Sequence, residues 1–250
     1  MASTPKIPTY AAPALEKGFN VIELLADHPR GLSISEIATA LGLSMSEIFR
    51  IIMVMERREW LHKGGGDRYR VTTKVLELAF RATPARELVE AAVGPMGDLA
   101  KAIIQSCHLV VRNGSTGLVV FRQETPGPTA FSVRVGSEVS LEATCSGHVL
   151  LAFNALDNGQ QIAAPLPGGI LGATLQRVRA RGYEMMKSGR TLGVTDISFP
   201  IFGAQGLALA ALTVPFLQLI DGTQSVDKDV AKSQLQTAAA RISEELGSVI

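Results

Sequence analysis

The sequence predicts an α+β fold in two domains, a small N-terminal domain of helices with a short hairpin and a larger C-terminal α/β domain with an antiparallel sheet. Two apolar-periodic segments meet at a Gly-Leu-Ser break within residues 31–60, and a triple glycine separates two extended runs within residues 60–73. Further along the chain, helical segments alternate with apolar extended runs. The pattern changes near residues 81–87, where a proline and small residues mark the domain boundary.

Length and composition place the chain among ordinary globular proteins. The 250 residues are 46% hydrophobic and 19% charged, and the formal net charge is +1, so no strong overall field favours one class of partner. The N-terminus lacks the features of a signal peptide, and the most apolar segment, residues 206–220, is too short to span a bilayer. We therefore expect a cytoplasmic protein with no membrane partner. Cys107 and Cys145 are far apart in sequence, so we expect no disulfide framework, metal or cofactor.

Three helical segments open the N-terminal domain. Residues 14–26 place apolar side chains on one helical face, and the sequence DHPRG that follows ends this helix. Ser33 is the predicted N-cap of the second helix, and Glu36 three residues later completes a capping box. Ser44 and Glu47 repeat this pattern at the start of the third helix.

A turn containing Gly42 joins the second and third helices, and this spacing is the helix-turn-helix signature. In that motif the N-terminal residues of the second helix of the pair contact base edges in the major groove of DNA. Residues 60–73 predict a two-stranded wing whose basic side chains face phosphates. From Ser44 to Lys74, seven basic residues outnumber four acidic ones. The predicted DNA-contacting residues are Ser33, Ser44, Met45, Ser46, Glu47, Arg50, Arg57, Lys63, Arg68 and Arg70.

Glycine-broken helical pairs with basic faces also occur in proteins that never bind DNA. The alternative function is a metabolite-binding adaptor that uses its helix-turn-helix for protein contacts. A salt-dependent shift with a promoter fragment distinguishes the two. The apolar residues of segments 14–26 and 74–80 exceed what a small three-helix core can bury, so we expect a homodimer contact there.

The C-terminal domain is expected to alternate helices and strands. Its final two strands show little alternation, which indicates burial on both faces. The predicted helices cover residues 86–104 with a kink at Gly94 and Pro95, then residues 147–156, 174–182 and 228–247, and the predicted strands lie within residues 108–123, 196–202 and 207–216.

Residues 14–79 resemble the winged helix-turn-helix of IclR-type transcriptional regulators. Residues 132–153 are similar to the strand, loop and helix that open the family's effector pocket, and residues 178–216 are similar to its closing signature. The resemblance spans about residues 14–247 and implies a GAF-like effector-binding domain, a dimer or a dimer of dimers, and control of a catabolic operon. The implied boundaries are 10–80 for the winged helix-turn-helix domain, 81–92 for a linker helix and 93–250 for the effector-binding domain.

The recognition helix departs from the family's common sequence SKSTVHR, because this chain has SMSEIFR over residues 44–50. Met45 replaces a common basic residue, and Glu47 replaces a hydroxyl. We therefore expect one lost phosphate contact and one new acceptor for the amino group of cytosine. The operator should differ accordingly.

The effector pocket departs further. In members that bind small oxo-acids, the resemblance implies an acid at the Met186 position, a cysteine at the Asp196 position, and hydroxyls at the Thr213 and Pro215 positions. An ionised Asp196 repels a bare carboxylate, so we expect a larger, aromatic effector that offers a hydrogen-bond donor such as a phenol, amide or hydrazide. Ordinary core packing explains Leu141 and Met186 equally well, and Asp196 could simply cap a turn. The predicted effector-binding residues are His108, Leu109, Leu141, Cys145, Ser146, Met186, Asp196, Thr213 and Pro215.

Enzymatic function is not expected. Cys145 and His148 lie three residues apart, but no acidic residue nearby in the sequence orients the histidine. The triple-glycine segment lacks the lysine and hydroxyl residue of a phosphate loop. We therefore expect a repressor whose partners are double-stranded operator DNA, a small-molecule effector, and copies of itself in a homodimer or tetramer.

Overall fold

The computed structural model describes residues 12–82, 85–157, 167–220, 224 and 226–248. The chain divides into two compact units between Ala82 and Thr83. Residues 10 and 11 of the expected first domain, and Thr83 and Pro84 of the expected linker, lie outside the described residues.

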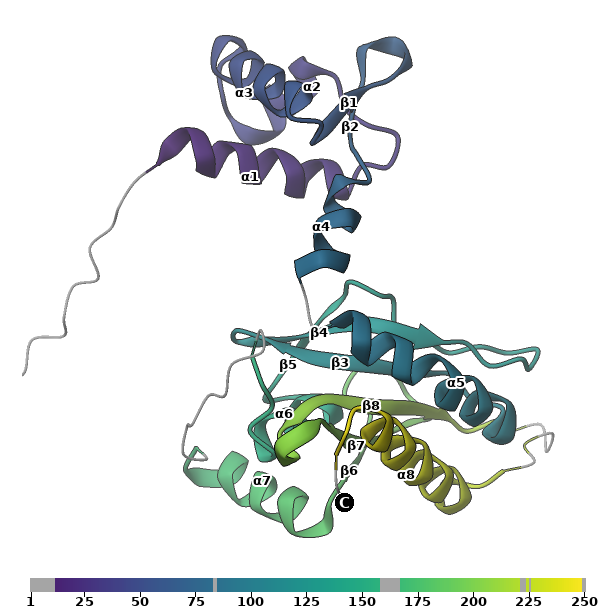
Figure 1. Ribbon diagram of the computed structural model, residues 1–250. Helices are drawn as coiled ribbons and strands as arrows, with labels where there is room; N and C mark the ends of the chain where they lie inside the picture. Colours follow the sequence, from purple (N-terminus) through teal and green to yellow (C-terminus); the bar gives the residue numbers. More distant parts are fainter. Residues whose placement is uncertain (1–11, 83–84, 158–166, 221–223, 225, 249–250) are drawn as a thin grey trace, which may run out of the picture. The chain divides into compact units, whose positions relative to one another are not determined.

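The N-terminal unit contains helices and a short hairpin, as the sequence predicts (Figure 1). Strands β1 and β2 pair antiparallel as the wing, and Leu32 extends this pairing through a bridge to Tyr69. The elements in order are α1 (Pro13–Ala26), α2 (Ile34–Leu41), α3 (Met45–Arg57), β1 (Leu61–Lys63), the 3₁₀ turn η1 (Gly65–Asp67), β2 (Tyr69–Val71) and α4 (Lys74–Ala82).

Both predicted capping boxes are present. The side chain of Ser33 accepts a hydrogen bond from the backbone of Glu36, and Ser44 does the same with Glu47. Gly42 ends α2 in the left-handed region with φ 65°, which a glycine adopts at no steric cost. The chain bends by 117° between α2 and α3, within the range that the helix-turn-helix motif uses.

The core of this unit lies where the three helices meet the wing. Side chains of α1, α2 and α3 fill it, and the wing adds Leu61 and Tyr69. The buried helical residues are Val21, Leu25, Ile37, Ala38, Ile48, Ile52 and Met55. Burial of this stripe orients α3, because its opposite side must then face outward.

The C-terminal unit is built on a six-stranded sheet with the order β5-β4-β3-β8-β7-β6, in which every neighbouring pair is antiparallel. Hairpin β7–β8 forms the sheet's longest pairing, and the 3₁₀ turn η2 (Ala204–Gly206) joins its strands. The strands are β3 (Cys107–Asn113), β4 (Thr116–Gln123), β5 (Glu138–Ser140), β6 (Glu184–Lys187), β7 (Val194–Phe202) and β8 (Ala208–Leu217).

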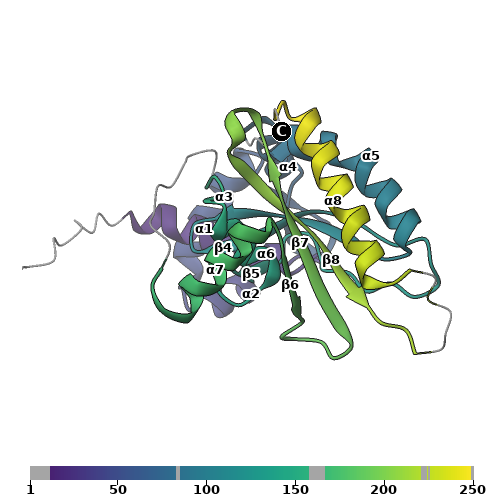
Figure 2. The same ribbon diagram turned by 90° about the horizontal axis from the view of Figure 1, so that it is seen from below.

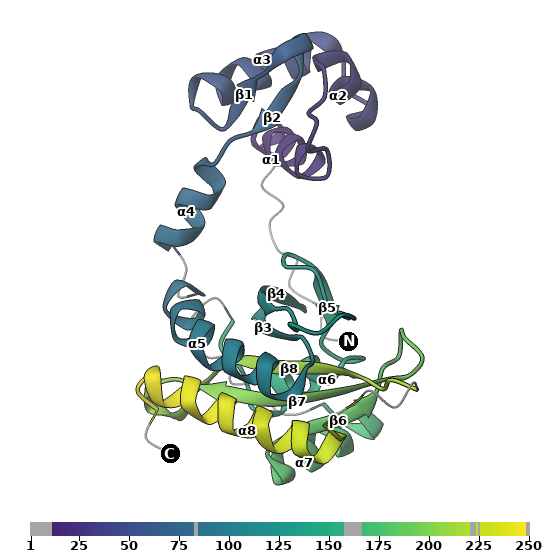
Figure 3. The same cartoon turned by 90° about the vertical axis from the view of Figure 1, so that its right-hand side faces the viewer.

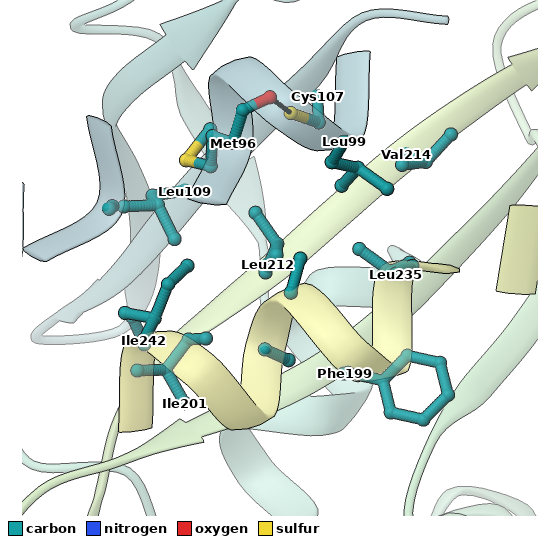
Figure 4. Close-up of a cluster of buried hydrophobic side chains, with 14 of the residues drawn as sticks. Met96, Leu99, Cys107, Leu109, Phe199, Ile201, Leu212, Val214, Leu235 and Ile242 are labelled. Carbon is teal, nitrogen blue, oxygen red and sulfur yellow. Dashed lines mark hydrogen bonds between the residues drawn. The ribbon is translucent and has the colours of Figure 1, made fainter. Parts of the chain in front are cut away.

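Helices cover both faces of this sheet. On one face α5 (Ala85–Ile103) lies beside α8 (Lys228–Glu245), and on the other face lie α6 (Cys145–Ala152) and α7 (Gly169–Arg181) (Figure 2 and Figure 3). Two separate apolar clusters result, one between the sheet and the α5–α8 layer and one between the sheet and the α6–α7 layer. Figure 4 shows the first of them, with side chains from β3, β7 and β8 meeting those of α5 and α8.

The segment expected as a linker helix is not one separate helix. The first two residues of segment 81–92, Arg81 and Ala82, belong to α4. From Ala85 onward the segment forms the first turns of α5. Leu88, Ala91 and Ala92 are buried in the cluster beneath α5 and α8, so these turns are part of the C-terminal core. Helix α5 also continues through Gly94 and Pro95 to Ile103.

Helix α6 approaches its neighbouring backbone closely at Gly147. A Cβ atom at this position would lie 2.4 Å from the carbonyl oxygens of Ser140 and Leu141. The side chain of Thr144 caps α6 and also donates to the Ser140 carbonyl oxygen at 2.6 Å. The end of β5 and the start of α6 are thus in direct contact. Over the described residues, no single helix has the length and apolar composition needed to cross a membrane.

Candidate functional site

The outer face of α3 is the candidate DNA-contacting surface. Ser46, Arg50 and Arg57 are exposed on it, opposite the buried stripe of this helix. The Arg50 Nε atom donates to the Ser46 carbonyl oxygen at 3.3 Å, which holds the guanidinium close to the start of the helix. Met45, at the first position of the helix, is 53% exposed.

Phe49 was not predicted as a site residue, yet it lies on this surface. It is 51% exposed and follows Met45 by four residues, so the two side chains are neighbours along one edge of α3. The spacing of four residues between Met45 and Phe49 can be read from the sequence. Met45, one turn earlier on the same edge, is among the predicted contacts, and this spacing places Phe49 beside it.

Glu47, for which a base contact is predicted, also has partners within the N-terminal unit. The Oε1 atom of Glu47 accepts from the Lys17 Nζ of α1 at 2.7 Å, and its Oε2 atom accepts from the backbone N–H and the hydroxyl of Ser44 at 3.2 and 2.6 Å. These hydrogen bonds, the one from Lys17 first, lower the pKa of Glu47 to about 2. Both carboxylate oxygens therefore bind groups of the domain itself, which orients the carboxylate toward α1 and the N-terminal end of α3. The Ser44 hydroxyl is engaged in the same contacts.

Ser33 and Arg68 have internal partners as well. The Ser33 hydroxyl donates to Glu36 at 2.9 Å as part of the α2 cap. The Arg68 guanidinium binds the Glu36 carboxylate at 3.1 Å and the Gly31 carbonyl oxygen at 3.0 Å, so it fixes the wing to α2. Lys63 pairs with Asp67 at 2.9 Å across the wing tip. Arg70, also on the wing, is exposed.

In the C-terminal unit, a row of polar side chains crosses the sheet on the face toward α6. The register pairs His108 of β3 with Thr213 of β8, Thr213 with Ser198 of β7, and Ser198 with Glu184 of β6. Directly paired residues of an antiparallel sheet share a face, so these side chains are neighbours. The hydroxyls of Ser198 and Thr213 are hydrogen-bonded at 2.8 Å.

His108 stands out in this row. Its Nδ1 atom is buried and has no hydrogen-bond partner among the described residues, and burial lowers the pKa of the ring to about 4. The imidazole is therefore neutral at pH 7. A buried polar atom without a partner is uncommon in native proteins and calls for an explanation.

Asp196 lies in the next row of the same face, paired with Met186 of β6 and Pro215 of β8. Burial raises the pKa of Asp196 to about 6, against a hydrogen bond from Ser188 that acts in the opposite direction. The Cys145 thiol at the start of α6 donates to the carbonyl oxygens of Glu184 and Asp196, each at 3.3 Å.

Most predicted effector residues thus come to one side of the sheet. Ser146 is buried beside Cys145 with its hydroxyl 3.4 Å from that of Thr144, and Leu141 belongs to the apolar cluster beneath α6 and α7. Leu109 is the exception, and its prediction as an effector-binding residue is wrong. It points to the opposite face, into the cluster beneath α5 and α8, as Figure 4 shows.

His148 has the acidic partner that sequence reasoning did not find. Its Nδ1 atom lies 3.2 Å from the Glu184 carboxylate, and its Nε2 atom lies 2.8 Å from the Glu142 carbonyl oxygen. Both partners can only accept, so both contacts are satisfied when the ring carries two protons. The hydrogen bond to Glu184 raises the pKa of His148, against the opposing effect of burial.

Glu184 completes this cluster. Burial favours its neutral form, but hydrogen bonds from His148 and the Met185 N–H, together with Arg181 at 2.8 Å, outweigh burial and lower its pKa. Burial, with the charges of Asp196 and Glu184, raises the pKa of the Cys145 thiol well above its usual range. A protonated thiol that donates to two carbonyls is a poor nucleophile, so the cluster is a structural clamp between α6 and β6.

Comparisons with known proteins agree with this architecture. Residues 14–65 match the model of the IclR helix-turn-helix domain, and residues 80–166 match that of the bacterial transcriptional regulator IclR C-terminal domain. The chain is 25% identical over 243 residues to the HTH-type transcriptional regulator KdgR of Escherichia coli K12, covering 92% of this chain and 91% of KdgR. It is 23% identical over 252 residues to the DNA-binding transcriptional repressor YiaJ of the same organism, covering 95% and 89%.

Among solved structures, the chain is similar to an IclR homolog from Microbacterium hydrocarbonoxydans complexed with 4-hydroxybenzoate. The TM-score is 0.76 at 22% identity, and the match covers 94% of this chain and 100% of that one. At this identity the likeness supports the fold. The relatives are transcriptional regulators and not enzymes. The chain therefore belongs to the IclR family of bacterial transcriptional regulators, with an N-terminal helix-turn-helix domain and a C-terminal effector-binding domain.

Proposed function

We propose that this protein is a cytoplasmic repressor of a catabolic operon that binds duplex operator DNA as a homodimer or a dimer of dimers. A small aromatic effector with a hydrogen-bond donor releases it from the operator. YiaJ is named as a repressor, which supports the repressor role. The Microbacterium homolog is complexed with 4-hydroxybenzoate, whose aromatic ring and phenol hydroxyl match the proposed effector and whose carboxylate does not.

One observation carries the DNA-binding part of the proposal. Helix α3 buries Ile48, Ile52 and Met55 and leaves Ser46 and Arg50 exposed near its N-terminal end. In a helix-turn-helix protein this end enters the major groove, where arginine binds guanine or phosphate. Arg57 and Arg70 supply further exposed positive charge. In a dimer, two such helices would lie about 34 Å apart, or a multiple of that distance.

Exposed apolar residues of the N-terminal unit support the dimer. Leu15 and Phe19 on α1 are more than half exposed, and Leu76 on α4 is also exposed. A groove of about 810 Å³ lies between α1 and α3 and is lined mainly by apolar side chains. Apolar surface of this kind typically marks a protein contact.

The polar groups facing α6 support an effector with a donor. The unpartnered His108 Nδ1 atom, the Ser198–Thr213 hydroxyl pair and Asp196 share one face of the sheet. A mainly apolar ligand with a few polar atoms could be recognised by such a set. An ionised Asp196 accepts from an amide or phenol and repels a carboxylate.

Fluorescence anisotropy with DNA from upstream of the gene tests the DNA-binding part. We expect Arg50→Ala to weaken operator binding about tenfold at fixed salt, since a good base contact contributes about 1–3 kcal/mol. The matched control is Arg179→Ala, which removes an exposed arginine of α7 in the other unit. Equal binding by wild type and Arg50→Ala, or no preference of the wild type over random duplex, would contradict the proposal.

Titration calorimetry tests the effector class with benzamide, benzhydrazide and benzoate at pH 8, where Asp196 is ionised. We expect the two neutral donors to bind more tightly than benzoate. Asp196→Asn should remove the difference, because the amide no longer repels a carboxylate. Preferred binding of benzoate by the wild type would rule out this effector class.

A further inference from the structure

An apolar ridge runs along the exposed side of α3, next to the polar residues of the candidate DNA-contacting surface. Met45, Phe49 and Met53 follow one another at intervals of four residues and therefore stack along one edge of the helix. Met45 and Phe49 are each about half exposed, and Met53 is half-buried against the core. We call Met45 and Phe49 the methionine–phenylalanine pair.

This pair lies beside the polar residues with which α3 would contact DNA. Met45 occupies the first helical position, next to Ser46, and Phe49 immediately precedes Arg50. The pair is therefore continuous with the surface that the helix-turn-helix presents to the major groove. Any duplex that approaches Ser46 and Arg50 also approaches these two apolar side chains.

Glu47, between the two residues of the pair in sequence, has partners within the domain. Its carboxylate is turned toward α1, where it binds Lys17 and caps α3 through Ser44. The first two turns of α3 consequently present two large apolar side chains, one hydroxyl and one guanidinium. The 5-methyl group of thymine is the apolar feature of the major-groove edge of the bases, and Phe is a residue type that contacts it.

Building on the proposed DNA binding, we propose that Met45 and Phe49 select operator sequence by packing against thymine methyl groups in the major groove. Each methyl removed from water by such a contact changes the dissociation constant by about three- to fivefold, which corresponds to about 0.8 kcal/mol. Selectivity then rests on apolar contact at some operator positions and on Arg50 at others.

The experiment replaces thymine by deoxyuridine, which removes only the methyl group. Full-length protein first selects binding duplexes from a random library, and each thymine of a selected duplex is then replaced singly. Fluorescence anisotropy at fixed salt measures the affinities. We expect one or two positions in each half-site where uracil weakens wild-type binding about three- to fivefold.

Variants assign these positions to side chains. Phe49→Ala and Met45→Ala should each bind the thymine and uracil duplexes equally at the position their side chain contacts. Arg50→Ala should weaken binding to both duplexes by the same factor. Val93→Ala, which truncates a half-exposed apolar residue of α5, is the matched control and should keep the wild-type preference for thymine. Circular dichroism checks that each variant is folded.

Two outcomes would overturn the proposal. The first is equal wild-type affinity for thymine and uracil duplexes at every position. The second is a thymine preference that survives in the double variant Met45→Ala and Phe49→Ala. If that variant also forms a smaller oligomer in analytical ultracentrifugation, the pair is a protein contact. Failure of DNA binding itself is recognised separately, because no duplex would then be enriched over random sequence.

Discussion

At the scale of single residues, Glu47 joins the cap of one helix to a contact with another. The capping box could be predicted, because serine and glutamate three residues apart are a local pattern. The contact with Lys17 joins residues 30 positions apart, so no local pattern contained it. The ion pair with Lys17 therefore became visible only in the folded domain, whereas the base contact of Glu47 stays a prediction.

Lys17→Met should weaken operator binding about two- to fivefold at low salt, with a smaller effect at high salt. Without Lys17 the pKa of Glu47 rises toward its ordinary value of 4.5, so the carboxylate is still ionised at pH 7 and its charge then repels the phosphates. Anisotropy titrations at several salt concentrations measure this effect.

Adding Glu47→Gln to Lys17→Met should restore binding, because glutamine keeps the capping box without the charge. Lys101→Met on α5 is the control for loss of an exposed lysine. If the double variant binds no better than Lys17→Met alone, electrostatic shielding by Lys17 is not the cause.

Asp196→Asn should raise the melting temperature at pH 8. The carboxyl has a folded-state pKa of about 6 and an ordinary value of 3.8, so its ionisation opposes folding. The destabilisation caused by ionised Asp196 grows between pH 3.8 and 6 and is constant above that range. We expect a gain of about 3 °C at pH 8 and almost none at pH 4 in thermal unfolding followed by circular dichroism. A gain that is equal at both pH values would show that charge burial is not responsible.

At the scale of elements, sequence patterns located helices and long strands better than short strands. Caps and glycine stops determine the N-terminal helices, and apolar runs mark β7 and β8. Strands β5 and β6 are three and four residues long and have few apolar residues, so their pairing partners define them and a local pattern does not.

Leu109 could have been placed correctly from the sequence. Neighbouring residues of a strand point to opposite faces, so His108 and Leu109 could not both face one pocket. The boundary between α4 and α5 was harder to predict. The apolar positions of α5 continue the periodicity expected of a linker, and only packing against α8 and the sheet shows that they belong to the core.

The clamp between α6 and β6 gives a pH-dependent prediction. The raised pKa of His148 stabilises the fold below pH 6.5, and this contribution is lost as the pH rises through the folded-state pKa. The lowered pKa of Glu184 contributes above pH 4.5 and is lost as the pH falls. The clamp therefore stabilises the fold most between about pH 4.5 and 6.5.

His148→Gln should lower the free energy of unfolding by about 1–3 kcal/mol at pH 5.5, since glutamine is uncharged and has its donors on one nitrogen, whereas His148 contacts Glu184 and the Glu142 carbonyl oxygen through two ring nitrogens. The difference from wild type should shrink at pH 9. Urea denaturation at both pH values measures it, and His62→Gln on the exposed side of the wing is the control. A difference that is larger at pH 9 would contradict a protonated His148.

At the scale of the whole molecule, regulation requires that ligand binding in one unit change DNA binding by the other. A ligand does this only through different affinities for the conformations that bind DNA well and poorly. Typical coupling of about 1–3 kcal/mol changes operator affinity about 5- to 150-fold. The sequence predicted the two units but not the ligand, because the groups facing α6 come together from β3, β6, β7 and β8.

Coupling of this kind is reciprocal. Calorimetry with the tightest-binding ligand of the benzamide series, with and without saturating operator duplex, should give two dissociation constants. Their ratio should equal the factor by which that ligand weakens operator binding. A ligand affinity that does not change with DNA would show that the two sites are independent.

The contact at Gly147 decides how α6 can move. Because Gly147 has no side chain, α6 lies close to the backbone of Ser140 and Leu141, and we expect a displacement of α6 to carry this segment with it. Ser140 is also the last residue of edge strand β5, so such a displacement pulls at the hydrogen bonds that join β5 to β4. A displacement of α6 would thus reach the edge of the sheet, where β5 pairs with β4.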